Sequence, residues 1–365
     1  MVMRPRFRRF QFPSSNARYL RVVVVPQVLL FLIVSLLGLA AGQSEPGVQA
    51  LIRSGQAALD SGNFARAVSD FQQAWQIAPE NGEVNRGLLL SYLQAGDLNE
   101  AVQFGTTAVQ HWPNDSQLQH WLGLAYFKSG GNADAVRVLR RAENLDVKSF
   151  DIHFDLALVL LAENQATPAA EELETAVKLK PSAALAHVLL GRAYQNSNRT
   201  LQAIQQFQTA LRLDPETQLG HYHLGFAYAS LGRNQEAIAE YKKEIARSPQ
   251  NPIVLHQLGH SLLENGDWQA AIVYLRKASE LDQRNADLLY DLGKALMLEG
   301  SPQAATGILR QSIELKPSDP SPHYQMARAL EKLGKRDEAQ REWQLFAELK
   351  KQQPSSGGMA SGRVQ

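Results

Sequence analysis

The chain contains no cysteine among its 365 residues. This absence excludes disulfide bonds, thiolate metal sites and lipid attachment through an N-terminal cysteine. The sequence also has no strand-bounded Gly-x-Ser-x-Gly, no phosphate-binding glycine loop and no His-Glu-x-x-His, motifs that mark common enzyme sites. We therefore predict a protein that is not an enzyme, with no catalytic residues, no cofactor and no bound metal.

The chain has no large excess of positive or negative charge, since its formal net charge is +1. Residues 1–44 contain no aspartate, glutamate or lysine, but they hold six arginines. Removing these six from the 37 basic residues leaves 31, against 36 acidic residues. A region with this balance lacks the basic surface that nucleic acids require, so we expect no nucleic-acid partner.

The N-terminal arginines precede a long apolar run over residues 22–41. Pro26 and Gln27 interrupt the run and leave 14 residues, 28–41, a length typical of a signal-peptide core. Counted from Val22, the run has 20 residues and could cross a membrane as an anchor. Both alternatives stay open. In either case the arginines stay on the cytoplasmic side, so we expect an exported, extracytoplasmic protein of the periplasm or cell envelope.

The rest of the chain is periodic. Alanine recurs nine times at a spacing of 34 residues, at Ala67, Ala101, Ala135, Ala169, Ala203, Ala237, Ala271, Ala305 and Ala339. A small residue at a fixed position in each unit marks the place where two helices approach closely. The spacing therefore predicts a stack of helical hairpins.

Residues that end helices keep the same spacing. Each unit has glycine or asparagine where its first helix should end, at Gly62, Gly96, Gly130, Asn164, Asn198, Gly232, Gly266, Gly300 and Gly334. These two residue types tolerate the left-handed backbone conformation that closes a helix. A proline marks the end of the second helix in six units, at Pro79, Pro113, Pro181, Pro215, Pro249 and Pro317.

This pattern resembles the tetratricopeptide repeat family. The positions that carry the resemblance are the alanines, a leucine such as Leu88, Leu122 or Leu190, and a tyrosine such as Tyr92 or Tyr126. The resemblance implies an all-α fold, a right-handed superhelical solenoid of antiparallel helix pairs. We predict an array over residues 45–353 with repeats that start near 48, 82, 116, 150, 184, 218, 252, 286 and 320. Residues 354–365 are rich in glycine and serine and should form a disordered tail.

In this family the first helix of each repeat lines a concave groove. Two positions four residues apart share one face of that helix. Over repeats two to four they are largely apolar, with Leu90, Leu124 and Leu158, which could bind an apolar segment or only pack against neighbouring helices. Over repeats five to nine they are aromatic and basic, and we predict that they bind a partner: Arg192, Tyr222, Phe226, His256, His260, Tyr290, Lys294, Tyr324 and Arg328. Such residues suit a peptide that carries acidic groups.

Histidines raise the alternative of a metal site. Four of them, His153, His187, His221 and His323, occupy one repeat position and are interpreted as packing residues. His256, His260 and Glu264 lie four residues apart, so a single helix could offer three ligands to zinc. We regard the two histidines as groove-lining polar residues.

The sequence thus predicts a non-catalytic, extracytoplasmic scaffold that binds a protein or peptide in its concave groove. An alternative is a structural component of an envelope or secretion complex that self-associates or acts through its convex face, where Trp112, Trp268 and Trp343 could contribute.

Overall fold

A computed structural model describes residues 46–352. The predicted signal peptide or anchor (residues 1–44) and the predicted disordered tail (residues 354–365) lie outside these residues, as do residues 45 and 353 at the two ends of the predicted array. Every regular element within 46–352 is an α-helix. The all-α solenoid predicted from the repeat is therefore confirmed.

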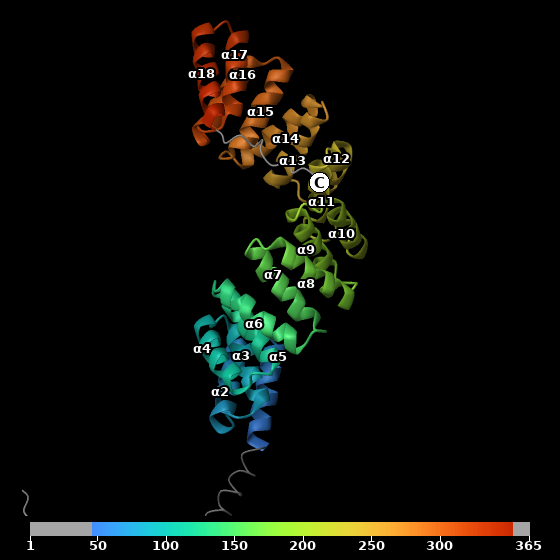
Figure 1. The fold of residues 1–365 in the computed structure, drawn as a ribbon, viewed down its shortest axis with the longest axis vertical. Coiled ribbons are helices and arrows are strands. Elements are labelled where there is room, and N and C mark those ends of the chain that lie inside the picture. Colours follow the sequence, from blue (N-terminus) through green and yellow to red (C-terminus); the bar gives the residue numbers. More distant parts are fainter. Residues whose placement is uncertain (1–45, 353–365) are drawn as a thin grey trace, which may run out of the picture. The chain divides into compact units, whose positions relative to one another are not determined.

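The helices alternate between first and second members of a pair (Figure 1). The first members are the helix of residues 46–60, α3 (Gly82–Ala95), α5 (Ser116–Lys128), α7 (Phe150–Ala162), α9 (Ala184–Asn196), α11 (Gly220–Ser230), α13 (Pro252–Glu264), α15 (Ala286–Glu299) and α17 (Pro320–Lys332). The second members are α2 (Phe64–Ile77), α4 (Leu98–His111), α6 (Asn132–Leu145), α8 (Ala166–Leu179), α10 (Thr200–Leu213), α12 (Asn234–Arg247), α14 (Trp268–Leu281), α16 (Pro302–Leu315) and α18 (Arg336–Gln352).

The chain divides into two compact units between Gly96 and Asp97. In the first unit, α2 packs against α3, and the Phe71 ring lies beside Gly55 and Gly87. A Cβ atom on either glycine would lie within 2.6 Å of this ring. Small residues at these two positions therefore let the aromatic ring fill the space between the helices.

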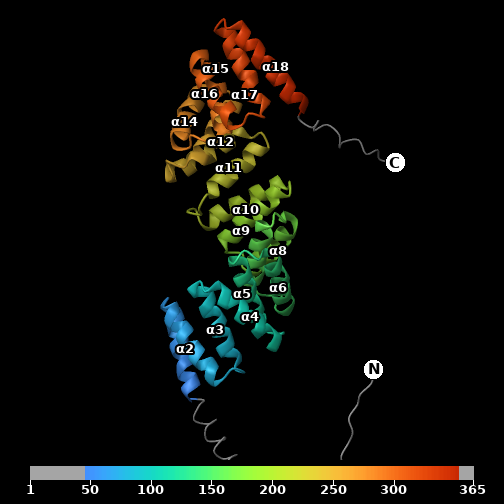
Figure 2. The same cartoon turned by 90° about the vertical axis from the view of Figure 1, so that its left-hand side faces the viewer.

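In the second unit, residues 97–352, each helix packs against the next one in the chain. Successive first helices also contact each other, from α5 through α17, whereas successive second helices in this unit do not. Figure 2 shows the succession of pairs from another side. The first helices therefore form one continuous face of this unit.

The predicted helix ends are confirmed in all nine repeats. All seven glycines have φ values between 71° and 87°, and Asn164 and Asn198 have φ values of 57° and 60°. The repeated alanines are buried, from Ala67 to Ala339. Side chains also cap the starts of several first helices. Asp115, for example, accepts a hydrogen bond from the backbone nitrogen of Leu118, which satisfies a donor that the helix cannot pair.

One first helix differs from the others at its start. Leu219 has a φ of +55°, and α11 begins at Gly220 with 11 residues rather than the 13 or 14 of its neighbours. The Arg247 guanidinium donates to the backbone oxygen of Glu216 at 2.7 Å and to its carboxylate at 2.9 Å. These contacts hold the chain before α11 in a non-helical path.

Candidate functional site

The nine predicted partner-binding residues lie on the first helices α9, α11, α13, α15 and α17, which contact one another in sequence. We call the face that these residues share the first-helix face. Its most exposed members are Arg192 and Arg328, together with Phe226, which is 39% exposed, and Tyr324, which is 36% exposed. The structure thus brings the predicted residues onto adjacent helices, and their role in binding stays a prediction.

Two tyrosines of this face are partly buried. Burial raises the pKa of both Tyr222 and Tyr290. The Tyr222 ring lies 6.2 Å from the Tyr241 ring and 6.3 Å from the Phe226 ring, measured between centroids. Tyr222 and Tyr290 therefore contribute to packing between helices as well as to the surface.

Tyr324 also has a structural contact, because it packs on the last helix. Its ring centroid lies 5.2 Å from that of Trp343 and 5.4 Å from that of Phe346. The indole nitrogen of Trp343 donates to Glu331 at 2.9 Å. Trp343 thus joins α18 to α17, while Trp112 and Trp268 are half-buried.

A buried carboxylate organises the middle of the first-helix face. Oδ2 of Asp291 lies 3.0 Å from Nε2 of His256 and 3.0 Å from Nδ1 of His260. The hydrogen bond to Asp291 raises the pKa of His260. Burial alone would raise the pKa of Asp291, but the hydrogen bonds from the two histidines outweigh burial and lower it. From the sequence, Asp291 is expected to be a solvated carboxylate of a first helix, whereas the structure buries it beside the two histidines.

The zinc alternative at His256, His260 and Glu264 is not supported. Both histidines point to Asp291, whereas the Glu264 carboxylate accepts a hydrogen bond from Nζ of Lys294 at 2.9 Å. Their potential ligand atoms are not among those that the structure brings together within residues 46–352. The ion pair between Glu264 and Lys294 also reduces the positive charge that Lys294 offers to a partner.

Two arginines of the first-helix face, Arg192 and Arg328, remain available to contact a partner. Within residues 46–352, the Arg192 side chain makes no hydrogen bond or ion pair, and Arg328 lies over the Tyr324 ring at 5.7 Å. Arg192 also acts on a neighbouring repeat, where His223 stacks on Phe207 at 5.5 Å. Burial, together with the nearby Arg192 charge, lowers the pKa of His223 to about 4. His223 is therefore neutral at physiological pH.

The apolar positions of repeats two to four are half-buried. Leu90 lies in the first unit, and Leu124 and Leu158 lie in the second. Near them, Nε2 of His120 lies 2.7 Å from the Asp155 carboxylate. This hydrogen bond joins α5 to α7 and matches the pairing of His256 with Asp291.

The four histidines at one repeat position connect the two helices of their own repeats. Nδ1 of each histidine lies 2.6 to 2.7 Å from an oxygen of the side chain 19 residues later, in the pairs His153–Glu172, His187–Gln206, His221–Glu240 and His323–Glu342. Three of the four partners are carboxylates. These histidines therefore act as polar links in the helix packing.

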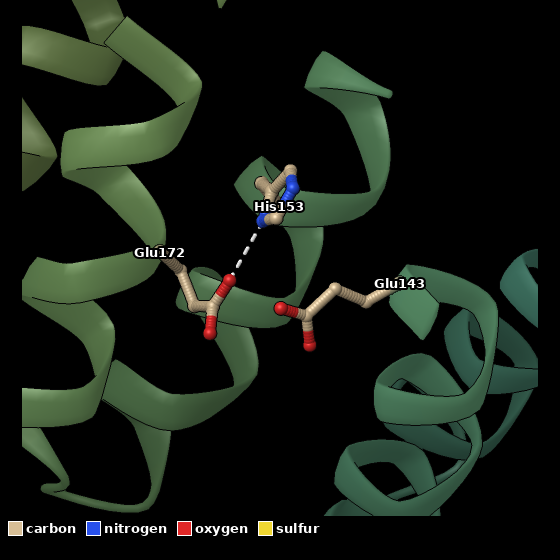
Figure 3. Close-up of side chains that lie close together, drawn as sticks. All are labelled: Glu143, His153 and Glu172. Carbon is tan, nitrogen blue, oxygen red and sulfur yellow. Dashed lines mark hydrogen bonds and ion pairs between the residues drawn. The ribbon is translucent and has the colours of Figure 1, made fainter. Parts of the chain in front are cut away.

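The His153 pair differs from the others because a second carboxylate lies beside it. Glu143 on α6 approaches His153 on α7 and Glu172 on α8, and the ligand atoms of the three lie within 4.8 Å of one another (Figure 3). His153 and Glu172 are buried, and Glu143 is half-buried. The Arg140 guanidinium contacts both glutamates.

The helix pairs and the continuous first-helix face define an α-solenoid of the kind that binds other proteins. Models of the tetratricopeptide repeat match residues 122–184, 154–196 and 188–252 and, in a second model, residues 58–104. A model described as anaphase-promoting complex, cyclosome, subunit 3 matches residues 264–341. The chain belongs to the tetratricopeptide repeat family.

Solved structures share this fold. A crystal structure of the APC/C hetero-tetramer Cut9-Hcn1 has a TM-score of 0.51 and 19% identity, and the match covers 73% of this chain and 52% of that one. This chain thus spans about half of that protein's length. A crystal structure of MamA has a TM-score of 0.42 and 25% identity over 44% of this chain and 95% of that one. YrrB, described as a TPR protein with an unusual peptide-binding site, has a TM-score of 0.46 and 21% identity over 52% of this chain and 97% of that one.

No curated protein sequence matches the chain. Among residues 46–352, no helix has both the length and the apolar character needed to span a membrane.

Proposed function

We propose that this protein is a non-catalytic, extracytoplasmic scaffold that holds a protein or peptide against the first-helix face of its second unit. One observation carries the proposal. Predicted binding residues from five successive repeats lie on first helices that contact one another, so they can act on one partner together. Interfaces commonly depend on a few aromatic and arginine side chains of this kind.

The chemistry of the face suggests what the partner offers. Arg192 and Arg328 supply positive charge at its two ends, and Phe226 and Tyr324 supply exposed aromatic surface. The histidines and Lys294 between them are already paired with Asp291 and Glu264. A segment with apolar side chains and separated acidic groups would match this pattern better than a uniformly acidic one.

Charge reversal tests the face without removing its packing residues. We expect Arg192→Glu with Arg328→Glu to weaken binding of the protein that co-purifies with the full chain from its native cells by tenfold or more. The matched control is Arg310→Glu, since Arg310 is an exposed arginine on the second helix α16. If the double variant binds as tightly as the parent, the first-helix face is not the binding surface.

The location outside the cytoplasm is proposed from residues 1–44. Because the chain has no cysteine, one introduced by Val273→Cys on α14 would be its single thiol, at a position that is 64% exposed. A maleimide reagent that cannot cross the cytoplasmic membrane should label this thiol in intact cells. Labelling only after lysis would contradict export.

A further inference from the structure

The second unit contains a close group of three side chains that has no role in the proposed function: Glu143, His153 and Glu172. These residues come from three consecutive helices, α6, α7 and α8, of two successive repeats. Their side chains converge on one small region (Figure 3). The group contains one imidazole nitrogen and two carboxylates, a set of ligands common in transition-metal sites.

Hydrogen bonding fixes the role of each nitrogen of His153. Nε2 lies 3.1 Å from the backbone oxygen of Val147, and a carbonyl oxygen only accepts, so Nε2 donates. Nδ1 lies 2.7 Å from Oε2 of Glu172. A lone pair on Nδ1 would face a carboxylate at this distance, so a proton lies between the two atoms. A zinc ion bound to both, at about 2.0–2.2 Å from each, would need them to separate to about 3.3 Å. Metal-binding histidines commonly donate their other N–H to a backbone carbonyl in this way.

The second carboxylate, that of Glu143, is not a general feature of the repeats. Glu143 stands where most other repeats carry an apolar residue, namely Trp75, Val109, Val177, Leu211, Ile245, Ile313 and Ala347. Several of these residues pack against the core from a partly buried position. The other three repeats with a histidine at the position of His153 therefore have a single side-chain partner where this repeat has two carboxylates.

Arg140 balances the negative charge of the two glutamates. Its Nη1 donates to Glu143 at 3.0 Å and also contacts Glu172. The Arg140 side chain is 38% exposed, unlike those of His153 and Glu172, which are 5% and 6% exposed. The guanidinium can therefore move towards solvent while the buried ligands stay in place.

We propose that Glu143, His153 and Glu172 bind one divalent transition-metal ion, with zinc as its representative. The ion would replace the proton between Nδ1 of His153 and Glu172, and that proton would pass to solvent. Arg140 leaves the carboxylates when the ion enters, and water completes the four-coordinate shell that zinc prefers. The ion would connect α6, α7 and α8 and so fix two repeats relative to each other.

Zinc titration of the full, chelator-treated chain tests the proposal by calorimetry. We expect one zinc ion to bind with micromolar affinity, and the affinity to fall at least tenfold in Glu143→Val, which restores the residue of repeats two and four. Glu143→Gln is the second variant, because it keeps the size of the side chain. Circular dichroism establishes that each variant remains folded. Arg140→Met should bind zinc more tightly than the parent, because it removes the competing cation.

Two further measurements distinguish a metal site from a structural network of ion pairs: the pH dependence of zinc binding and competition by calcium. Binding should weaken as pH falls, since zinc must displace a proton, and calcium should not compete because imidazole is a poor ligand for it. Failure of the parent to bind zinc up to millimolar concentrations would overturn the proposal. Equal affinity and stoichiometry in the parent, Glu143→Val and Glu143→Gln would also overturn it, because the zinc would then bind elsewhere on the chain.

Discussion

Glycines at the contact between paired helices set how closely the backbones approach. A Cβ atom at Gly191 would lie 2.5 Å from the Phe207 ring, a separation that the fully buried ring cannot relieve by a small shift. The helical glycine Gly307 on α16 has no heavy atom within 4 Å of its Cβ position. Alanine substitutions at Gly191 and Gly307 therefore distinguish the cost of steric overlap from the gain in helix propensity.

We expect Gly191→Ala to lower the free energy of unfolding by about 1–3 kcal/mol, because it overpacks the core. Gly307→Ala should raise it by about 0.5–1 kcal/mol, because alanine favours the helix without a clash. Urea denaturation of the two variants measures both effects. A stabilising Gly191→Ala would contradict the close approach of α9 and α10.

The pairing of His260 with Asp291 predicts a pH dependence. The folded-state pKa of His260 is raised, so its contribution is complete below the unfolded value of about 6.5 and is lost as pH rises through the folded value. The pKa of Asp291 is lowered, so its contribution is present above about 3.9 and is lost as pH falls through the folded value. Both contributions are favourable between these limits.

We therefore expect His260→Ala to destabilise the protein more at pH 5.5 than at pH 9. Urea midpoints of the parent and the variant at the two pH values give this difference directly. An equal difference at both values would show that the hydrogen bond to Asp291 does not depend on the charge of His260.

Backbone conformation at the helix ends could be predicted, because glycine and asparagine mark the left-handed position in every repeat. Leu219 could not be predicted in this way. A leucine rarely adopts a positive φ, and this conformation costs about 1–2 kcal/mol relative to the helical one. The contacts of Arg247 with Glu216 in the preceding loop stabilise it, and Arg247 lies 31 residues beyond Glu216 in the sequence.

At the scale of helices, side chains at two repeat positions, 19 residues apart, link the first helix of a repeat to the second. Where the first position is histidine, the side chain 19 residues later is glutamate or glutamine. In repeats seven and eight the first position is leucine and the later residue is Tyr274 or Ile308, whereas in repeat one Leu51 is followed by Asp70. The 19-residue spacing is present in the sequence, but a comparison of one repeat position at a time does not show it.

A double-mutant cycle tests this link in the last repeat. Glu342→Ile alone should destabilise the protein by about 1–3 kcal/mol, because it leaves buried His323 without its partner. Adding His323→Leu reproduces the pair Leu289–Ile308 of the preceding repeat and should recover most of that loss. If the two substitutions act additively, the helices are not joined through this pair.

At the scale of the whole molecule, the solenoid could be predicted from the 34-residue period, and the residues of the first-helix face from the resemblance to the tetratricopeptide repeat family. The partners of the predicted residues could not. Asp291 bonds to two histidines of the preceding repeat, and Glu264 pairs with Lys294 of the following one. These contacts depend on how neighbouring repeats are rotated, which no single repeat specifies.

Tyr290 is partly buried, and Tyr324 packs on α18 within its own repeat. Replacing these tyrosines with alanine would disturb the stack as well as the surface, so binding tests belong on residues without such contacts. Phe226 suits this purpose better, because its side chain on α11 is exposed and its ring contact, with Tyr222, lies within the same helix. Val273 on the second helix α14 is an exposed apolar residue away from the first-helix face and provides the matched position.

Photo-crosslinking in living cells tests most directly whether the first-helix face binds a partner. A benzophenone side chain is placed in the full chain at Phe226 or, separately, at Val273. We predict a covalent adduct with a second protein from position 226 and none from position 273. An adduct from position 273 alone would place the partner on the second helices and contradict the account.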